Sequence, residues 1–222
     1  MKYQVVESFS SINGEGLKAG ELAYFIRFAG CNLNCSYCDT KWANAADVDF
    51  EWQTKAQIYK KIKAAGIKNV TLTGGEPLLQ KGIKDLLSFL DQDEQIEVEI
   101  ETNGSIDLAL FKAQGYKRIA FTMDYKLEGS QMEAHMYLAN FTALTKDDVL
   151  KFVISSPKEL EQVAEIVRDY ELIDRCHILL SPVYGKIEPL QIVDFMKAKQ
   201  LNGVRVQLQL HKIIWNPDER GV

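Results

Sequence analysis

Residues 23–38 read AYFIRFAGCNLNCSYC, an apolar segment that runs through a short turn into three closely spaced cysteines. The spacing of Cys31, Cys35 and Cys38 allows one loop to wrap three thiolates around a single metal centre. Iron–sulfur clusters held wholly by protein normally take four thiolates, so three would leave one iron open to another ligand. Structural zinc is the alternative, but a closed zinc site needs four nitrogen or sulfur ligands. The three histidines are all remote in sequence, so the stretch favours an iron–sulfur cluster with an open iron.

The fourth cysteine, Cys176, stands just before an expected strand over His177 to Ser181, at the N-terminal end of that strand. The cysteine loop instead follows the C-terminal end of its own strand. In a parallel sheet these two ends differ by about five residues, or roughly 16 Å. We therefore expect Cys176 to be a small buried apolar residue and not a fourth ligand.

Apolar segments rich in β-branched residues recur along the chain, with helical segments between several of them. The expected strands span Ala23 to Phe28, Asn69 to Thr73, Ile96 to Glu101, Arg118 to Met123, Val149 to Ile154, His177 to Ser181 and Val204 to Leu210. Their spacing of roughly 25 to 30 residues is typical of right-handed βαβ units, which predicts a parallel sheet.

Two of the expected helices carry clear start signals. Thr54 and Gln57 form a capping box at the start of a helix over Thr54 to Ala65, which ends at Gly66. A second helix begins with Ser156 as N-cap, followed by Pro157 in the first turn and Glu159 at the third helical position. These signals place helices on both sides of the middle of the chain.

Polar residues interrupt two of the expected strands. Glu97, Glu99 and Glu101 alternate with apolar residues in one strand, and Arg27 projects opposite the apolar face of another. Fully covered parallel strands usually read as continuous apolar runs. One face of the sheet must therefore meet something polar, which predicts an incomplete parallel α/β barrel around a polar cavity. The alternative for Glu97 and Glu99 is exposure to solvent on an edge strand.

Length and composition indicate one globular domain over residues 1–222. The chain is 46% hydrophobic and 26% charged, near ordinary globular usage, and no linker-like tract marks a boundary. Its 26 basic and 31 acidic side chains give a net charge of -5, so a nucleic acid is not the expected main ligand. No apolar run approaches the ~20 residues of a membrane span and no signal-peptide core is found, so we expect a cytoplasmic protein.

Two motifs resemble those of the radical S-adenosylmethionine superfamily. One is the cysteine run with the aromatic Tyr37 before its last cysteine, and the other is Thr73-Gly74-Gly75-Glu76-Pro77 after an expected strand. Within that superfamily the chain is similar to the 7-carboxy-7-deazaguanine synthase family over nearly its whole length. The resemblance lies in residues 11–16, 38–40, 101–104, 124–126 and 210–212 and in Trp215. One departure is Asn13, where that family commonly has glutamine.

The resemblance implies three cofactors and assigns residues to them. A [4Fe–4S] cluster would be held by Cys31, Cys35 and Cys38, and Mg²⁺ by Thr40. S-adenosylmethionine would be bound by Tyr37, Cys38, Asp39, Gly74, Gly75, Glu76, Glu101, Asp124, Tyr125 and Lys126. Substrate would be bound by Ile12, Asn13, Gly14, Glu15, Arg27, Thr73 and His211, with His211 also a catalytic residue, and the N- and C-terminal segments would complete this site.

The resemblance also implies a reaction, the ring contraction of 6-carboxy-5,6,7,8-tetrahydropterin to 7-carboxy-7-deazaguanine with loss of ammonia, as in queuosine biosynthesis. It implies a reducing partner such as flavodoxin or ferredoxin, and a homodimer. Two other functions stay open: an activating enzyme for a glycyl radical protein, and a non-catalytic iron–sulfur electron-transfer module.

For three of these residues a purely structural role stays open as an alternative. Arg27 suits a substrate carboxylate, but it could instead pair with one of the glutamates at 97 to 101. Thr40 could be an ordinary loop threonine. His211 could be a satisfied buried histidine.

Overall fold

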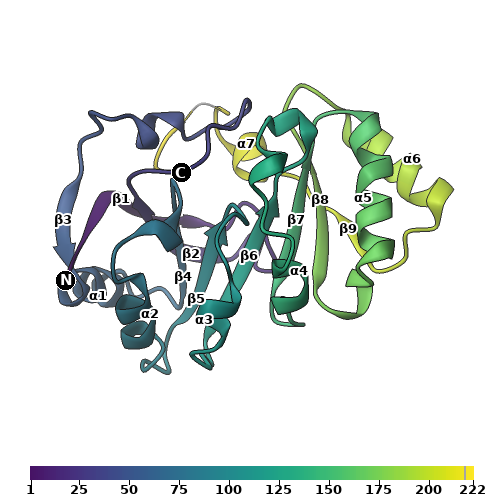
Figure 1. Cartoon of the computed structure of the whole chain (residues 1–222). Coiled ribbons are helices and arrows are strands. Elements are labelled where there is room, and N and C mark those ends of the chain that lie inside the picture. Colours follow the sequence, from purple (N-terminus) through teal and green to yellow (C-terminus); the bar gives the residue numbers. More distant parts are fainter. Residues whose placement is uncertain (218) are drawn as a thin grey trace.

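The fold is built on one continuous sheet, seen here in a computed structural model that describes residues 1–217 and 219–222 (Figure 1). Within these residues the sheet has nine strands in the order β3-β1-β2-β4-β5-β6-β7-β8-β9. The strands are β1 (Lys2–Ile12), β2 (Leu22–Phe28), β3 (Glu51–Thr54), β4 (Asn69–Gly74), β5 (Glu97–Thr102), β6 (Ile119–Tyr125), β7 (Val149–Ile154), β8 (His177–Pro182) and β9 (Val204–Val206). From β2 to β9 every pairing is parallel, while β1 pairs antiparallel with both β2 and β3.

All seven predicted strands are confirmed, and β1 and β3 are additional. The predicted strand over Val204 to Leu210 ends early, at Val206. Gln207 N still donates to Leu180 O of β8, and the side chain of Gln207 exchanges hydrogen bonds with the backbone of Gly16. Strand β1 has a polar second half, and β3 has four residues with only Gln53 fully buried. Both are held by pairing with a neighbour, and neither carries a strong apolar pattern of its own.

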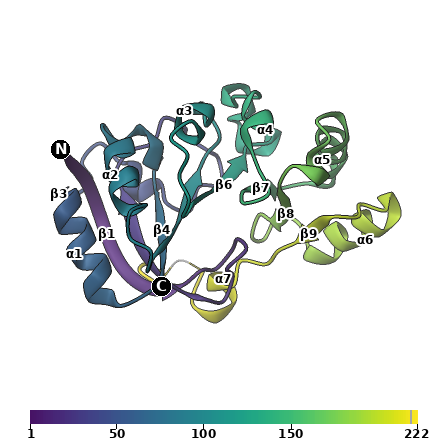
Figure 2. The same cartoon turned by 90° about the horizontal axis from the view of Figure 1, so that it is seen from below.

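Helices cover the outer side of the curved sheet, as Figure 2 shows for α1 to α6. The helices are α1 (Lys55–Ala65), α2 (Ile83–Leu90), α3 (Ala109–Lys112), α4 (Asn140–Ala143), α5 (Pro157–Asp169), α6 (Pro189–Lys199) and α7 (His211–Ile214). Short 3-10 turns are η1 (Lys41–Asn44), η2 (Pro77–Leu79), η3 (Glu128–Ser130), η4 (Glu133–His135) and η5 (Leu172–Asp174). The main core lies between this helical layer and the sheet, where apolar side chains of both layers are fully buried.

The two predicted helix starts have different outcomes. Thr54 and Gln57 form the expected capping box of α1, and Gly66 follows in the left-handed region with φ 67°. At α5 the side chain of Ser156 makes no capping bond. Glu159 instead accepts hydrogen bonds from Ser155, one residue earlier than the predicted cap.

The sheet does not close into a barrel, because β3 and β9 are its two unpaired edges in the described chain. This confirms an incomplete α/β barrel with a polar inner side. The edge-strand alternative is wrong, because β5 lies between β4 and β6. Glu97 is half-exposed and pairs with Lys18 and Lys68, whereas the carboxylate of Glu99 is buried.

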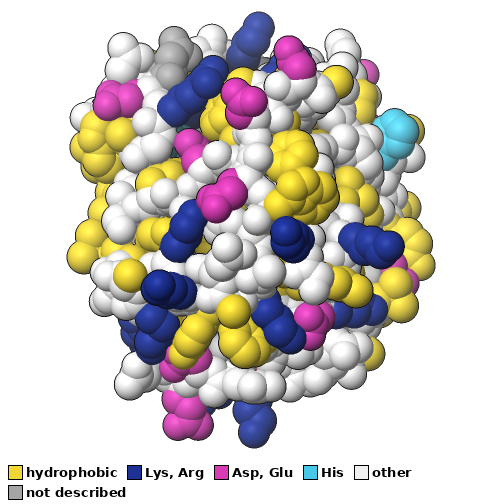
Figure 3. Space-filling model, turned by 90° about the vertical axis from the view of Figure 1, so that its left-hand side faces the viewer, with side chains coloured by type: hydrophobic (Ala, Val, Ile, Leu, Met, Phe, Trp, Pro, Cys, Tyr) yellow, Lys and Arg dark blue, Asp and Glu magenta, His cyan; other side chains and the backbone are white. Residues whose placement is uncertain are grey.

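The outer surface mixes charges of both signs. On the face drawn in Figure 3, basic and acidic side chains are mixed among apolar ones. The ion pairs Lys55–Asp85 and Lys63–Asp93 join α1 to α2 and the turn after it. Within the described residues, no helix has both the length and the apolar character needed to span a membrane.

Candidate active site

The carboxyl ends of the parallel strands border a cavity of about 460 Å³. Most of the site residues expected from the sequence line it: Ile12, Gly14, Glu15, Arg27, Cys31, Cys35, Tyr37, Cys38, Asp39, Thr40, Thr73, Gly74, Gly75, Glu101, Asp124, Lys126 and His211. Three of the expected residues lie outside the lining, namely Asn13, Glu76 and Tyr125. Side chains from both ends of the chain and from most strands thus meet in one place.

The cysteine loop brings three thiols to this cavity. Cys31, Cys35 and Cys38 all line it, and burial raises the pKa of the Cys31 and Cys35 thiols. In the described chain, no three His, Cys, Asp or Glu side chains are already close enough together to form a metal-binding group. Three soft sulfur donors on one loop, open to a cavity, nevertheless match the donor set of an iron–sulfur cluster with one free iron position.

Cys176 lies where the sequence predicts it. It precedes β8, it is 7% exposed, and burial raises the pKa of its thiol to about 11. Because β2 and β8 run parallel, Cys176 is at the opposite end of the sheet from the cysteine loop, and it is absent from the cavity lining.

The two glycines after β4 are required by protein packing. A Cβ atom on Gly74 would lie 2.4 Å from the carbonyl oxygen of Phe28, and one on Gly75 would lie 1.8 Å from that of Gly30. The family resemblance assigns both glycines to the binding of S-adenosylmethionine, and both line the cavity. In the structure they let the end of β4 approach the turn that leads into the cysteine loop.

Glu76 lies just outside the cavity lining and connects the end of β4 to the end of β5. Its fully buried carboxyl group accepts hydrogen bonds from Leu78 N at 3.0 Å, Thr102 Oγ1 at 2.9 Å and Asn103 N at 2.7 Å. Burial raises the pKa of Glu76 to about 7, although these hydrogen bonds oppose the shift. This carboxyl group therefore does not line the cavity itself but holds in place Thr102 and Asn103, which do.

The raised pKa of Glu76 predicts a pH effect on stability. Because Glu76 titrates near 7 when folded and near 4.5 when unfolded, its stabilising contribution is full below pH 4.5 and is lost as the pH rises through 7. Glu76→Gln stays neutral, so its free energy of unfolding should gain about 2 to 3 kcal/mol relative to the parent between pH 5 and pH 8. Urea unfolding of the cluster-free proteins across this range measures the difference. A difference independent of pH would mean that Glu76 is ionised throughout.

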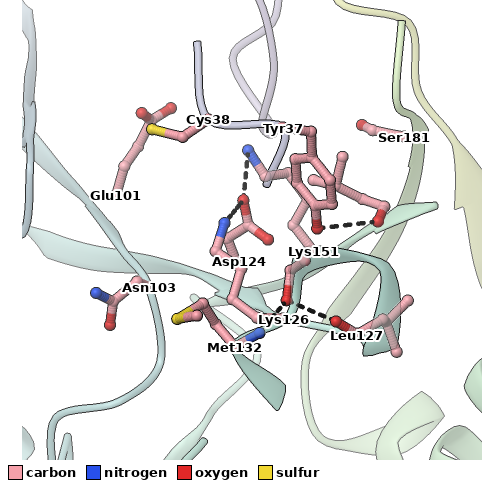
Figure 4. A network of polar contacts seen from close by, with 12 residues as sticks. Tyr37, Cys38, Glu101, Asn103, Asp124, Lys126, Leu127, Met132, Lys151 and Ser181 are labelled. Atoms are coloured by element: carbon pink, nitrogen blue, oxygen red, sulfur yellow. Dashed lines mark hydrogen bonds and ion pairs between the residues drawn. The ribbon is translucent and has the colours of Figure 1, made fainter. Parts of the chain in front are cut away.

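A cluster of buried charges forms the inner wall of the cavity (Figure 4). Lys151 Nζ lies 3.3 Å from Glu15 Oε2 and 3.7 Å from Asp124 Oδ2, and Lys126 Nζ lies 2.9 Å from the same oxygen of Asp124. Burial alone would lower the pKa of Lys151, but Glu15 and Asp124 raise it well above its ordinary value. Burial would raise the pKa of Glu15, yet Lys151 and Ser181 hold it below its usual range. Glu15 and Lys151 are therefore both charged at neutral pH.

Arg27 and Trp42 mark another wall of the cavity. Arg27 Nε donates to Glu7 Oε1 at 2.8 Å, and its Cζ lies 5.9 Å from the centre of the Trp42 ring. The alternative that Arg27 pairs with a glutamate of β5 is wrong about the partner, because that partner is Glu7 of β1. Arg27 is only 15% exposed, but it still borders the cavity.

His211 and Gly14 bring the two ends of the chain together. Leu210 N donates to Gly14 O at 3.0 Å, and a Cβ atom on Gly14 would lie 2.2 Å from His211 Nδ1. Burial lowers the pKa of His211, although Glu15 opposes the shift, so the ring is neutral at pH 7. Beside it, Lys212 Nζ lies 3.1 Å from Asp39 Oδ2 on the cysteine loop.

Asn13 and Tyr125 are held by the protein interior. Asn13 Oδ1 accepts from Thr71 Oγ1 at 2.8 Å, and the buried Nδ2 of Asn13 has no partner among the described residues. Tyr125 packs its ring against Phe141 and Phe152. Nearer the cavity, Thr73 Oγ1 donates to Glu101 Oε2 at 2.9 Å.

Sequence reasoning missed several lining residues. They are Glu7, Trp42, Lys151 and Gln209. Lys151 did leave a signal, because it is the single charged residue in the otherwise apolar strand VLKFVI. The others come from loops or from β1, where no local pattern points inward.

Comparison with known proteins decides the family. A model of the radical SAM superfamily matches residues 25–185. The 7-carboxy-7-deazaguanine synthase of Clostridium acetobutylicum is 56% identical over the full length of both chains. This chain belongs to the 7-carboxy-7-deazaguanine synthase family. Another family member, from Chlorobaculum tepidum, is 36% identical over 98% of this chain and 96% of its own.

A solved structure supports the same fold. The crystal structure of QueE from Escherichia coli matches with a TM-score of 0.71 over 94% of each chain, at 20% identity. Membership of the radical SAM superfamily within the 7-carboxy-7-deazaguanine synthase family implies an iron–sulfur cluster and S-adenosylmethionine as cofactors. The three thiols at the cavity fit that requirement.

Proposed function

We propose that the protein converts 6-carboxy-5,6,7,8-tetrahydropterin to 7-carboxy-7-deazaguanine with loss of ammonia. The observation that carries this proposal is the single cavity in which the cysteine loop meets Arg27, Lys151 and His211. A synthase of that name shares 56% identity with this chain over its full length. A partly enclosed cavity of about 460 Å³ suits a small bicyclic ligand better than the loop of a partner protein.

The chain's own residues would divide the work between the two sides of the cavity. Cys31, Cys35 and Cys38 would hold the cluster, which together with S-adenosylmethionine supplies a radical able to remove a hydrogen atom from substrate. Arg27 would bind the substrate carboxylate, and the neutral His211 could give or take a proton beside the ring. Residues 1–222 would act as one domain, with the segments around Gly14 and His211 completing the substrate site.

Anaerobic turnover of the purified pterin with the reconstituted protein, reductant and S-adenosylmethionine tests the proposal. We expect 7-carboxy-7-deazaguanine and ammonia in equal amounts. Formation of 5′-deoxyadenosine without any change in the pterin would favour action on another substrate, such as a glycyl radical protein. Absence of 5′-deoxyadenosine and methionine would favour a non-catalytic electron-transfer module.

Arg27→Met should weaken substrate binding. Methionine keeps much of the apolar stem of arginine but removes the planar donor group. Loss of a charge-assisted contact should cost about 1.5 to 3 kcal/mol, or about ten- to a hundredfold in apparent affinity. Anaerobic titration with the pterin measures this, and cleavage of S-adenosylmethionine without substrate serves as the control, because it should persist. Parental affinity combined with lower fold stability would make Arg27 only the ion-pair partner of Glu7.

Thr40→Ala should affect magnesium. Thr40 Oγ1 lies 3.5 Å from Cys38 Sγ at the cavity, and a hard cation prefers that oxygen to the neighbouring sulfur. We expect slower turnover chiefly at limiting magnesium, with the visible spectrum of the cluster unchanged. Parental rates at every magnesium concentration would leave Thr40 as a loop residue.

Three further features belong to the same proposal. The cluster needs an electron, for which a flavodoxin or ferredoxin is the proposed donor. A homodimer is proposed on the family resemblance, and a cytoplasmic location on the absence of a membrane-spanning helix in the described chain.

A further inference from the structure

Glu159, in the first turn of α5, is a buried carboxylate that the chemistry above does not use. It is 2% exposed. Glu159 Oε1 accepts from Gly129 N at 2.7 Å, and Oε2 accepts from Ser155 N at 2.5 Å and from Ser155 Oγ at 2.7 Å. In the described chain no lysine or arginine forms an ion pair with it. Its two carboxyl oxygens are therefore held by two segments, the β7–α5 junction and η3.

The turn η3 in turn holds the cysteine loop. Ser36 N donates to Ser130 O at 3.0 Å, and Ser36 Oγ donates to Gly129 O at 2.5 Å. Ser36 lies between the cluster ligands Cys35 and Cys38 in sequence. The same residue of η3, Gly129, thus donates its N–H to Glu159 and accepts from Ser36 through its carbonyl group.

The contact between η3 and α5 leaves no room for a side chain at position 129. A Cβ atom on Gly129 would lie 2.0 Å from Ser155 Oγ and 2.7 Å from Glu159 Oε1. The next residue of the cysteine loop, Tyr37, also reaches this region, since its hydroxyl donates to Val153 O of β7 at 3.4 Å (Figure 4). Two adjacent residues of the cysteine loop are thus held, Tyr37 by the end of β7 and Ser36 by η3, which in turn bonds to α5 through Glu159.

We propose that Glu159 is a positioning residue for the iron–sulfur cluster. It fixes η3, and η3 fixes Ser36 and so the spacing of Cys35 and Cys38. A loop held before the cluster arrives loses less conformational freedom on binding it. The inference rests on the proposed function only in that these cysteines hold one cluster. It needs no particular substrate.

Glu159→Gln tests this role, because glutamine has nearly the same size and shape as glutamate. Glutamine presents an NH₂ group where one carboxylate oxygen accepted, so one of the N–H donors loses its acceptor. In the cluster-free protein, we expect amide hydrogen exchange at Ser36 to become about tenfold faster. In the reconstituted protein, we expect an iron chelator to bleach the cluster absorbance about tenfold faster.

Asp148→Asn is the control, a change of the same kind at another buried carboxyl group. Asp148 is also fully buried and accepts from Phe121 N at 3.0 Å, from Thr145 N at 2.8 Å and from Thr145 Oγ1 at 2.8 Å. Unlike Glu159, it also pairs with a lysine, Lys112, whose Nζ lies 2.6 Å from Oδ1. Asp148 precedes β7, at the end of the sheet away from the cysteines. This control should lower global stability without changing exchange at Ser36 or the bleaching rate.

The outcomes separate cleanly. Parental exchange at Ser36 in Glu159→Gln, or a change equal to that in Asp148→Asn, overturns the proposal. If Glu159→Gln does not fold, Ser36→Ala removes only the bond to Gly129 O and should accelerate exchange of the cysteine loop and bleaching by a smaller factor. No change in Ser36→Ala would then overturn it. Because exchange is measured without cluster or substrate, failure of the proposed reaction leaves this result readable.

Discussion

Replacing Cys31, Cys35 or Cys38 by alanine is expected to abolish cluster loading after anaerobic reconstitution. Each variant would leave two thiolates at the cavity, too few to hold a cubane cluster whose fourth iron has no protein ligand. Iron and sulfide content and the visible absorbance of the reconstituted protein measure the loss. Formation of 5′-deoxyadenosine should fall to background in all three variants.

Cys176→Ala provides the control within the same chain. Cys176 is buried at the opposite end of the sheet, and its Sγ donates to Leu172 O at 3.9 Å. Its replacement leaves a small void that should lower the free energy of unfolding by about 1 kcal/mol. The iron content after reconstitution should equal that of the parent. Equal loss of iron in all four variants would rule out a three-cysteine site.

The fold was largely predictable because each parallel strand can be recognised from its own residues, without knowledge of its neighbours. Strands such as β7 are buried on both faces, so each reads as a short apolar run regardless of its neighbours. The antiparallel strands β1 and β3 could not be found in this way. The half-exposed residues of β1 become a strand through pairing with β2, in a register that no local pattern specifies.

The candidate site was predictable where chemistry is concentrated in consecutive residues. The cysteine loop and the glycines after β4 stand out because cysteine and paired glycine are uncommon and closely spaced. Glu7 and Gln209 could not be found, because each reaches the cavity through a strand or loop contact formed only in the folded chain. Glu159 was identified as a helix-capping residue, and its link to Gly129, 30 residues away, could not be read from the sequence.

Lys151→Met is expected to lower the free energy of unfolding at pH 7 by about 3 to 5 kcal/mol, the usual cost of leaving a buried charge without its partner. Asp124 keeps Lys126 at 2.9 Å, but Glu15 keeps only the neutral donors Ser181 and Gln209. Urea unfolding of the cluster-free protein measures the loss. Without Lys151, burial should raise the pKa of Glu15. The deficit should therefore shrink as the pH falls through this raised pKa, because the carboxyl group takes up a proton and loses its unpaired charge.

The double variant Lys151→Met/Glu15→Gln decides whether this cost is electrostatic. Removing the uncompensated carboxylate should restore most of the lost stability, since replacing both members of a buried ion pair is far milder than removing one. Glu15→Gln alone should also destabilise the protein, because it leaves Lys151 with only one acidic partner, Asp124 Oδ2 at 3.7 Å. Lys126 already pairs with that same oxygen at 2.9 Å. If the double variant is as unstable as the two single losses added together, Lys151 contributes through packing of its stem in β7 and the charge cluster is not a coupled unit. Recovery of stability without recovery of turnover would show that the buried charges serve the reaction as well as the fold.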